Sequence, residues 1–135
     1  MKILVIDAQG GGIGRQLITA LKKTLPDAVV TAVGTNSAAT AAMLKAGADR
    51  GATGENAVAV CCRDADVIAG PIGIVIADSM LGEITPAMAA AVGQSAAKRV
   101  LIPVNRCDTV IAGVAGGATG DLIADAVRKI ADCCG

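Results

Sequence analysis

The stretch KILVIDAQGGGIGRQL, residues 2–17, decides how the rest of the chain is interpreted. It opens with an almost uninterrupted apolar run at 2–6, which is typical of a strand buried on both faces of a parallel sheet. A glycine cluster at 10–14 follows. Ile13, Leu17 and Leu21 then repeat at four-residue spacing, so a helix is expected to run on toward Pro26. Strand, glycine loop and helix in this order predict the first unit of an α/β sheet.

The alternation of short apolar runs and helical patterns continues along the chain. Further strands are expected at 28–34, 48–52, 66–71, 99–104 and, as a sixth, 109–113. Helices are expected at 37–47, 54–62, 86–96 and 119–134, although valine and cysteine in 54–62 also suit a strand. The pattern predicts a single Rossmann-like domain, residues 1–135, with a doubly wound, mostly parallel sheet of five or six strands and helices on both faces.

Several residues are expected to mark helix ends and faces. Ser37, Thr53 and Thr85 are candidate N-caps, with Pro86 at the first helical position. The inward face of the last helix is expected to consist of Leu122, Ile123, Ala126, Val127 and Ile130.

The composition excludes several classes of function. Hydrophobic residues make up 53% of the 135 residues, and 12 basic and 12 acidic residues cancel, so no global field attracts nucleic acid or an anionic membrane. Histidine and aromatic residues are absent, which removes histidine acid–base chemistry and aromatic stacking on a base or flavin within one subunit. No apolar run approaches the roughly 20 residues that span a bilayer, and no signal-peptide core precedes Asp7. A cytoplasmic location is expected.

The cysteines are Cys61, Cys62, Cys107, Cys133 and Cys134, and none forms a C-x-x-C motif. Adjacent cysteines point in different directions on a helix or strand, which makes them poor zinc ligands, so no metal site is expected. Reduced thiols that fill small apolar spaces are the simplest interpretation. A metal or redox role would require Cys61 or Cys62 to meet Cys107 or the terminal pair in space.

The glycine loop is a candidate phosphate site. Glycines allow the backbone to approach an anion closely, and the following helix offers unpaired N–H groups with partial positive charge. The candidate residues are Gly10, Gly11, Gly12, Gly14 and Arg15. The match to G-x-G-x-x-G is partial, because Gln9 stands in place of the first glycine before Gly11 and Gly14. The P-loop pattern is not met, because Arg15 and Gln16 stand where the P-loop has lysine and serine or threonine. A purely structural strand-to-helix turn is the alternative.

The second predicted strand ends in GTNS, residues 34–37, where an NAD site commonly carries an acidic residue for the ribose hydroxyls. Here Thr35, Asn36 and Ser37 are neutral and rich in donors. This pattern tolerates a 2′-phosphate, so both NADP and NAD are candidate cofactors. An ordinary helix cap would account for the same residues.

Two further segments, TGEN at 53–56 and GPIG at 70–73, are expected beyond the carboxyl ends of central strands, where open α/β sheets bind ligands. The residues that would close one crevice with the glycine loop are Glu55, Asn56, Gly70, Pro71 and Gly73. Alternatively, Glu55 and Asn56 simply begin a helix.

Three carboxylates are candidates for chemistry. Asp7 stands where a receiver domain is phosphorylated, but Asn105 and Arg106 occupy the place of the lysine that such a domain needs. Asp78 and Glu83 form the best remaining pair for acid–base catalysis, with a solvated turn as the alternative. No catalytic residue is assigned.

Several stretches carry a family resemblance: VIDAQGGGIGRQL (5–17), AVGTNSAATAAMLKAGAD (32–49), GATGENAV (51–58), RDADVIAGPIGIVIADSMLGEITPAMA (63–89) and VLIPVN (100–105). They resemble a small family of uncharacterised bacterial Rossmann-like proteins, a domain of unknown function. The resemblance covers about residues 2–106. It implies a stand-alone Rossmann-like protein and brings no substrate or catalytic residue with it.

The sequence therefore predicts a protein that binds a phosphorylated small molecule, a nucleotide such as NADP or NAD, at the glycine loop. Whether it is an enzyme stays open. One alternative is a ligand sensor or assembly module without catalysis, in which PIGIVIADSML, 71–81, forms the interface of a homo-oligomer such as a dimer. The other alternative is a cysteine-based metal or redox protein.

Overall fold

The computed structural model describes residues 1–104, 109–114 and 118–133. The strands are β1 (Lys2–Asp7), β2 (Val29–Gly34), β3 (Arg50–Thr53), β4 (Val67–Pro71) and β5 (Lys98–Ile102). The helices are α1 (Gly12–Thr24), α2 (Ser37–Lys45), α3 (Glu55–Cys62), α4 (Pro86–Gln94) and α5 (Thr119–Asp132), and a short 3-10 helix, η1 (Ile72–Val75), follows β4.

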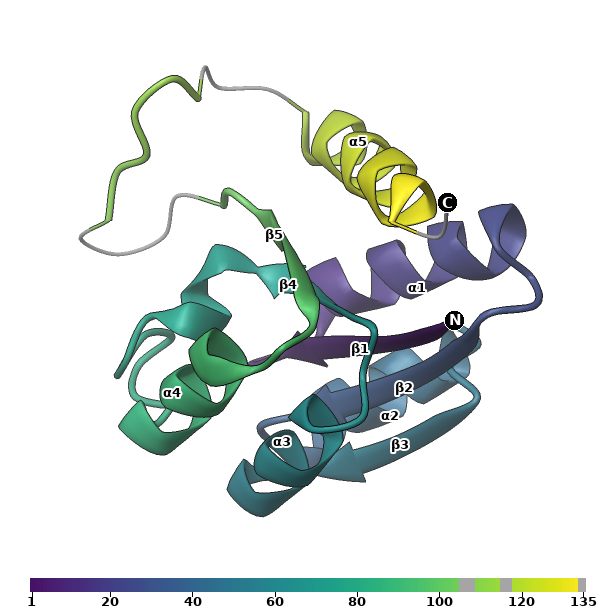
Figure 1. The fold of residues 1–135 in the computed structure, drawn as a ribbon. Coiled ribbons are helices and arrows are strands. Elements are labelled where there is room, and N and C mark those ends of the chain that lie inside the picture. Colours follow the sequence, from purple (N-terminus) through teal and green to yellow (C-terminus); the bar gives the residue numbers. More distant parts are fainter. Residues whose placement is uncertain (105–108, 115–117, 134–135) are drawn as a thin grey trace.

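The strands form one parallel sheet in the order β3-β2-β1-β4-β5 (Figure 1). The chain moves outward from β1 to β3 and then returns to the other side of β1, so the direction of winding reverses between β1 and β4. This arrangement confirms the predicted Rossmann-like α/β fold. The reversal matters for function, because ligands of open α/β sheets bind at the carboxyl ends of the strands at such a point.

The prediction of a sixth strand at 109–113 is wrong. The described sheet has five strands, and residues 109–113 pair with none of them. They lie in the sequence between β5 and α5, and Figure 1 draws them away from the sheet. Val110 is 85% exposed there, so the apolar run lacks the partner strand that would bury it.

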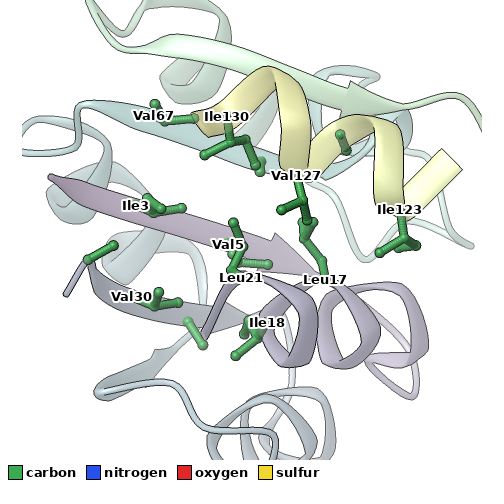
Figure 2. Close-up of a cluster of buried hydrophobic side chains, with 14 of the residues drawn as sticks. Ile3, Val5, Leu17, Ile18, Leu21, Val30, Val67, Ile123, Val127 and Ile130 are labelled. Carbon is green, nitrogen blue, oxygen red and sulfur yellow. The ribbon is translucent and has the colours of Figure 1, made fainter. Parts of the chain in front are cut away.

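Helices cover both faces of the sheet, and each face has its own apolar core. Helices α1, α2 and α5 pack on one face, and α3 and α4 pack on the other (Figure 1). Ile3 and Val5 of β1 contribute to the first core (Figure 2), whereas Leu4 and Ile6 contribute to the second. The uninterrupted apolar run of β1 follows from burial on both faces.

The predicted inward face of the last helix, α5, is confirmed. Ile123, Ala126, Val127 and Ile130 are buried against α1 and the sheet (Figure 2), and Leu122 is half-buried at the edge of the same core. These side chains contribute to a core that is built from aliphatic residues and methionine, since the chain has no aromatic residue.

The N-cap predicted at Thr85 is confirmed, with Pro86 at the first position of α4. The cap predicted at Ser37 is wrong, because Asn36 caps α2 and its side-chain oxygen accepts a hydrogen bond of 2.9 Å from the Ala39 amide. Ser37 is already the first helical residue, so it lies one position too late to cap the helix.

The segment 54–62 is a helix, as preferred over a strand, but Thr53 does not cap it. Thr53 is still the last residue of β3, and its hydroxyl lies 2.8 Å from that of Thr40 in α2. Gly54 therefore occupies the N-cap position, without a side chain to bond the helix. The Thr53 hydroxyl therefore contacts Thr40 of α2 instead of capping α3.

Candidate functional site

A cavity of about 370 Å³ lies at the carboxyl edge of the sheet, beside the ends of β1 and β4. Its walls come from the loop after β1, the first turn of α1, the end of β4 with η1, and the segment 76–80. Val104, Thr109 and Thr119 complete the described lining. The cavity therefore occupies the point where the winding of the sheet reverses.

Asp7 fixes the glycine loop at the floor of this cavity. Its Oδ1 accepts a hydrogen bond of 2.7 Å from the Ala8 amide, and its Oδ2 accepts one of 2.7 Å from the Gly14 amide. The residue is only 4% exposed. Both carboxylate oxygens thus bind the backbone that they position, a structural use that differs from that of a receiver aspartate.

The glycines of the loop have two different roles. A Cβ at Gly14 would lie 2.5 Å from Met43 Sδ and 3.0 Å from Asp7 Cβ, so Gly14 allows α1 to pack closely. A Cβ at Gly10 or Gly12 would meet nothing within 4 Å, and both residues line the cavity. The loop is therefore tight where it faces the protein and open where it faces the cavity.

Three backbone donors of this loop have no acceptor within the described residues. They are the N–H groups of Gly10, Gly12 and Ile13, and all three residues line the cavity. By contrast, the Gly11 amide donates to the Ala8 carbonyl at 3.0 Å. The first N–H groups of a helix point out of its N-terminal end, where they attract an anion.

The structure brings only some of the predicted site residues to the cavity. Those in the lining are Gly10, Gly12, Pro71 and Gly73. Gly11, Gly14 and Gly70 are buried behind it, and Arg15 and Ser37 are exposed outside the lining. No described residue of the lining is a lysine or arginine.

Glu55 and Asn56 begin α3 and lie outside the cavity lining. The Thr85 hydroxyl donates a hydrogen bond of 3.1 Å to Glu55 Oε1. This bond joins the starts of α3 and α4, which lie side by side on one face of the sheet.

Glu83 ties together three loops at the same edge of the sheet. Its Oε1 accepts hydrogen bonds from the Gln9 amide at 2.8 Å, the Thr35 hydroxyl at 2.6 Å and the Asn36 side-chain amide at 2.9 Å. The Thr35 hydroxyl, the Gln9 amide and the Asn36 amide hold the pKa of Glu83 below its usual value, against the opposing effect of burial. Thr35 and Asn36, the predicted ribose contacts, are therefore bound to a carboxylate that local sequence does not place beside them.

Asp78 and Glu83 occupy different environments. Asp78 is exposed and lines the cavity, as expected of a solvated turn. Glu83 is half-buried, lies outside the lining and points its Oε1 at the loops after β1 and β2. Only Asp78 faces the cavity, so the two carboxylates do not line it as a pair.

The backbone between η1 and α4 is strained. Asp78, Met80 and Leu81 have φ angles of 66°, 54° and 59°. This is a left-handed backbone conformation that residues other than glycine rarely adopt. Such conformations persist only where neighbouring contacts hold them. Glu83, which lies two residues after Leu81 and binds three donors, is one such contact.

The apolar stretch 71–81 is used mostly within the chain. Ile74 and Met80 are buried in the core beneath α4, and Ile72 and Ile76 line the cavity. Leu81 is the exception, since it is 93% exposed.

The described cysteines lie apart from the cavity. Cys61, Cys62 and Cys133 are free, and burial raises the pKa of Cys62 to about 11. Cys107 and Cys134, named in the metal or redox alternative, lie outside the described residues. Within the described part of the chain, no group of three or more cysteine, aspartate or glutamate residues could hold a metal ion.

The fold and the cavity define a Rossmann-like α/β protein with a candidate ligand site at the reversal of its sheet. The chain belongs to the family described as Domain of unknown function (DUF3842), whose model matches residues 2–135. No curated protein matches it. Among solved structures, it is similar to a dodecameric FMN-dependent Ubix-like decarboxylase from Escherichia coli O157:H7, with 17% identity and a TM-score of 0.46. The match covers 98% of this chain and 76% of that one.

None of the described helices is both long enough and apolar enough to cross a membrane.

Proposed function

We propose that this protein binds a phosphorylated small molecule, a nucleotide, with a phosphate at the glycine loop. The observation that carries the proposal is the group of three unpaired N–H donors at Gly10, Gly12 and Ile13, on the wall of a cavity at the reversal of the sheet. Backbone N–H groups and the dipole of α1 favour an anion at this position.

The described part of the lining offers a phosphate backbone donors and no lysine or arginine side chain. Among the described lining residues, the further side-chain donors are the amides of Gln9 and Gln16 and the hydroxyls of Thr109 and Thr119, whereas the Ser79 hydroxyl already donates to the Gly73 carbonyl at 2.6 Å. The Asp7 carboxylate is held by the loop itself, because both of its oxygens accept hydrogen bonds from loop amides. Ile13, Ile72, Ile76, Met80 and Val104 offer apolar surface to the remainder of the ligand.

NAD and NADP are the nucleotides that the sequence predicted, and the cavity volume of about 370 Å³ lies in the usual range of small-molecule sites. We propose binding without assigning a reaction. Among the described residues, the pKa values of Asp49, Cys62, Glu83 and Asp125 are shifted, and these four residues lie outside the cavity lining.

The test combines native mass spectrometry of freshly purified protein with calorimetric titration of NAD, NADP, ATP, GTP and coenzyme A. Gly12→Asp places a negative charge at the first position of α1. This charge interacts favourably with the helix dipole but repels a phosphate. We expect at least one nucleotide to bind, and Gly12→Asp to weaken it by about tenfold or more without lowering the melting temperature.

Gly93→Asp is the matched control, because Gly93 in α4 also has open space around it and lies outside the cavity lining. It should leave nucleotide affinity unchanged. Absence of binding by every nucleotide, or equal binding by wild type and Gly12→Asp, would overturn the proposal.

A further inference from the structure

Three donors converge on a single oxygen of Glu83. The Gln9 amide, the Thr35 hydroxyl and the Asn36 side-chain amide all reach Oε1. The second oxygen, Oε2, accepts no hydrogen bond from any residue that the structure describes, and the side chain is only half-buried. One oxygen is therefore anchored, while the other is left to accept a hydrogen bond from a ligand.

Glu83 stands between the cavity and the end of β2. Gln9 lines the cavity, whereas Thr35 and Asn36 directly follow β2. In Rossmann-like nucleotide sites, an acidic residue at the end of the second strand accepts hydrogen bonds from ribose hydroxyls, and a nearby arginine accommodates a 2′-phosphate. Here β2 is followed by neutral residues, and the segment before α4 supplies the acid instead.

The negative charge of Glu83 is not neutralised by a described basic residue. The described salt bridges involve Lys2, Lys22, Arg128 and Lys129, and none of them includes Glu83. Its donors also keep its pKa below the usual value, so the carboxylate is ionised at neutral pH. A phosphate brought beside it would meet an uncompensated like charge.

We infer that Glu83 sets the specificity of the nucleotide site: it accepts a hydrogen bond from a ribose hydroxyl and excludes a ribose that carries a 2′-phosphate. The ligand class is thus a nucleotide with an unmodified ribose, NAD rather than NADP. This inference rests on the proposed function. It reverses the expectation from the neutral residues Thr35, Asn36 and Ser37, which taken alone tolerate a 2′-phosphate.

The experiment is a calorimetric comparison of two ligand pairs that differ only in the 2′-phosphate. These pairs are NAD with NADP, and adenosine 5′-monophosphate with adenosine 2′,5′-bisphosphate. Each is titrated into wild type, Glu83→Gln and Asp27→Asn. Glu83→Gln keeps an oxygen for the three donors and removes the charge. Asp27→Asn removes a charge from an exposed residue at the opposite edge of the sheet, before β2.

We expect wild type and Asp27→Asn to bind the unmodified member of each pair about tenfold or more tightly than its 2′-phosphorylated partner. In Glu83→Gln, this ratio should fall by about tenfold, mainly through tighter binding of the 2′-phosphorylated ligand.

Equal affinity of wild type for both members of a pair would overturn the inference and leave the proposed function standing. An unchanged ratio in Glu83→Gln would also overturn it. If no nucleotide binds to any variant, the proposed function falls and this inference falls with it. A wild-type ratio close to one overturns the inference even if Glu83→Gln is too unstable to titrate.

Discussion

Thr35 donates a hydrogen bond of 2.6 Å to Glu83, a residue 48 positions further along the chain. The bond joins the loop after β2 to the segment that precedes α4, across the end of β1. Because Glu83 also binds Gln9 and Asn36, one carboxylate fixes the relative positions of three loops around the candidate site.

Removal of this carboxylate should destabilise the protein. Glu83→Ala leaves the Gln9 amide, the Thr35 hydroxyl and the Asn36 amide without their shared acceptor, so we expect a loss of about 1–3 kcal/mol in the free energy of unfolding. Glu83→Gln retains an acceptor oxygen and should lose clearly less. Urea unfolding at neutral pH measures both. Equal losses in the two variants would show that the oxygen is not what stabilises the loops.

The contribution of Glu83 should depend on pH. The Thr35 hydroxyl, followed by the Gln9 and Asn36 donors, holds its native pKa below the ordinary value of 4.5. A lowered native pKa means that the stabilisation is present above the unfolded value and is lost as the pH falls through the native one.

The measurement is the difference in free energy of unfolding between wild type and Glu83→Gln, from about pH 7 to about pH 3. The difference should be constant above the ordinary pKa and should shrink below it. Other carboxylates with lowered pKa values, such as Asp49, titrate in both proteins and cancel. A difference that grows on acidification would contradict the prediction.

Leu81→Gly should stabilise the protein. Leu81 has a φ of 59° and is 93% exposed, so glycine relieves a left-handed backbone and gives up almost no packing. We expect a gain of up to about 1 kcal/mol, since the left-handed conformation costs other residues roughly 1–2 kcal/mol and glycine loses more backbone entropy on folding. Leu81→Ala is the control, because it removes the same side chain and retains the strain. Equal effects of glycine and alanine in chemical denaturation would rule this explanation out.

Gly14→Ala should destabilise the protein, whereas Gly12→Ala should not. The added methyl at position 14 would lie 2.5 Å from Met43 Sδ, in the contact between α1 and α2. We expect a cost of about 1–3 kcal/mol, typical of an overpacked core. At position 12 the methyl meets nothing within 4 Å, so alanine should be neutral or stabilising by up to about 1 kcal/mol. Thermal unfolding of the pair measures the contrast, and similar melting temperatures would refute it.

Much of the fold is predictable from the sequence because its signals are local. The apolar run of β1, the four-residue spacing in α1 and the Thr85-Pro86 start of α4 each depend on residues close together in the chain. The predicted sixth strand failed for the opposite reason. A short apolar run becomes a strand only when another strand pairs with it, and residues 109–113 find none in the described sheet.

The candidate site likewise has features that local sequence predicts and features that depend on contacts between distant segments. The class of fold and the glycine loop are predictable from the sequence, because strand, turn and helix propensities act over a few residues. Tertiary packing places Gly10 and Gly12 at the cavity and Gly14 against Met43. It also decided that Glu83 supplies the charge at the end of β2, since hydrogen bonds between distant loops depend on how the sheet brings strand ends together.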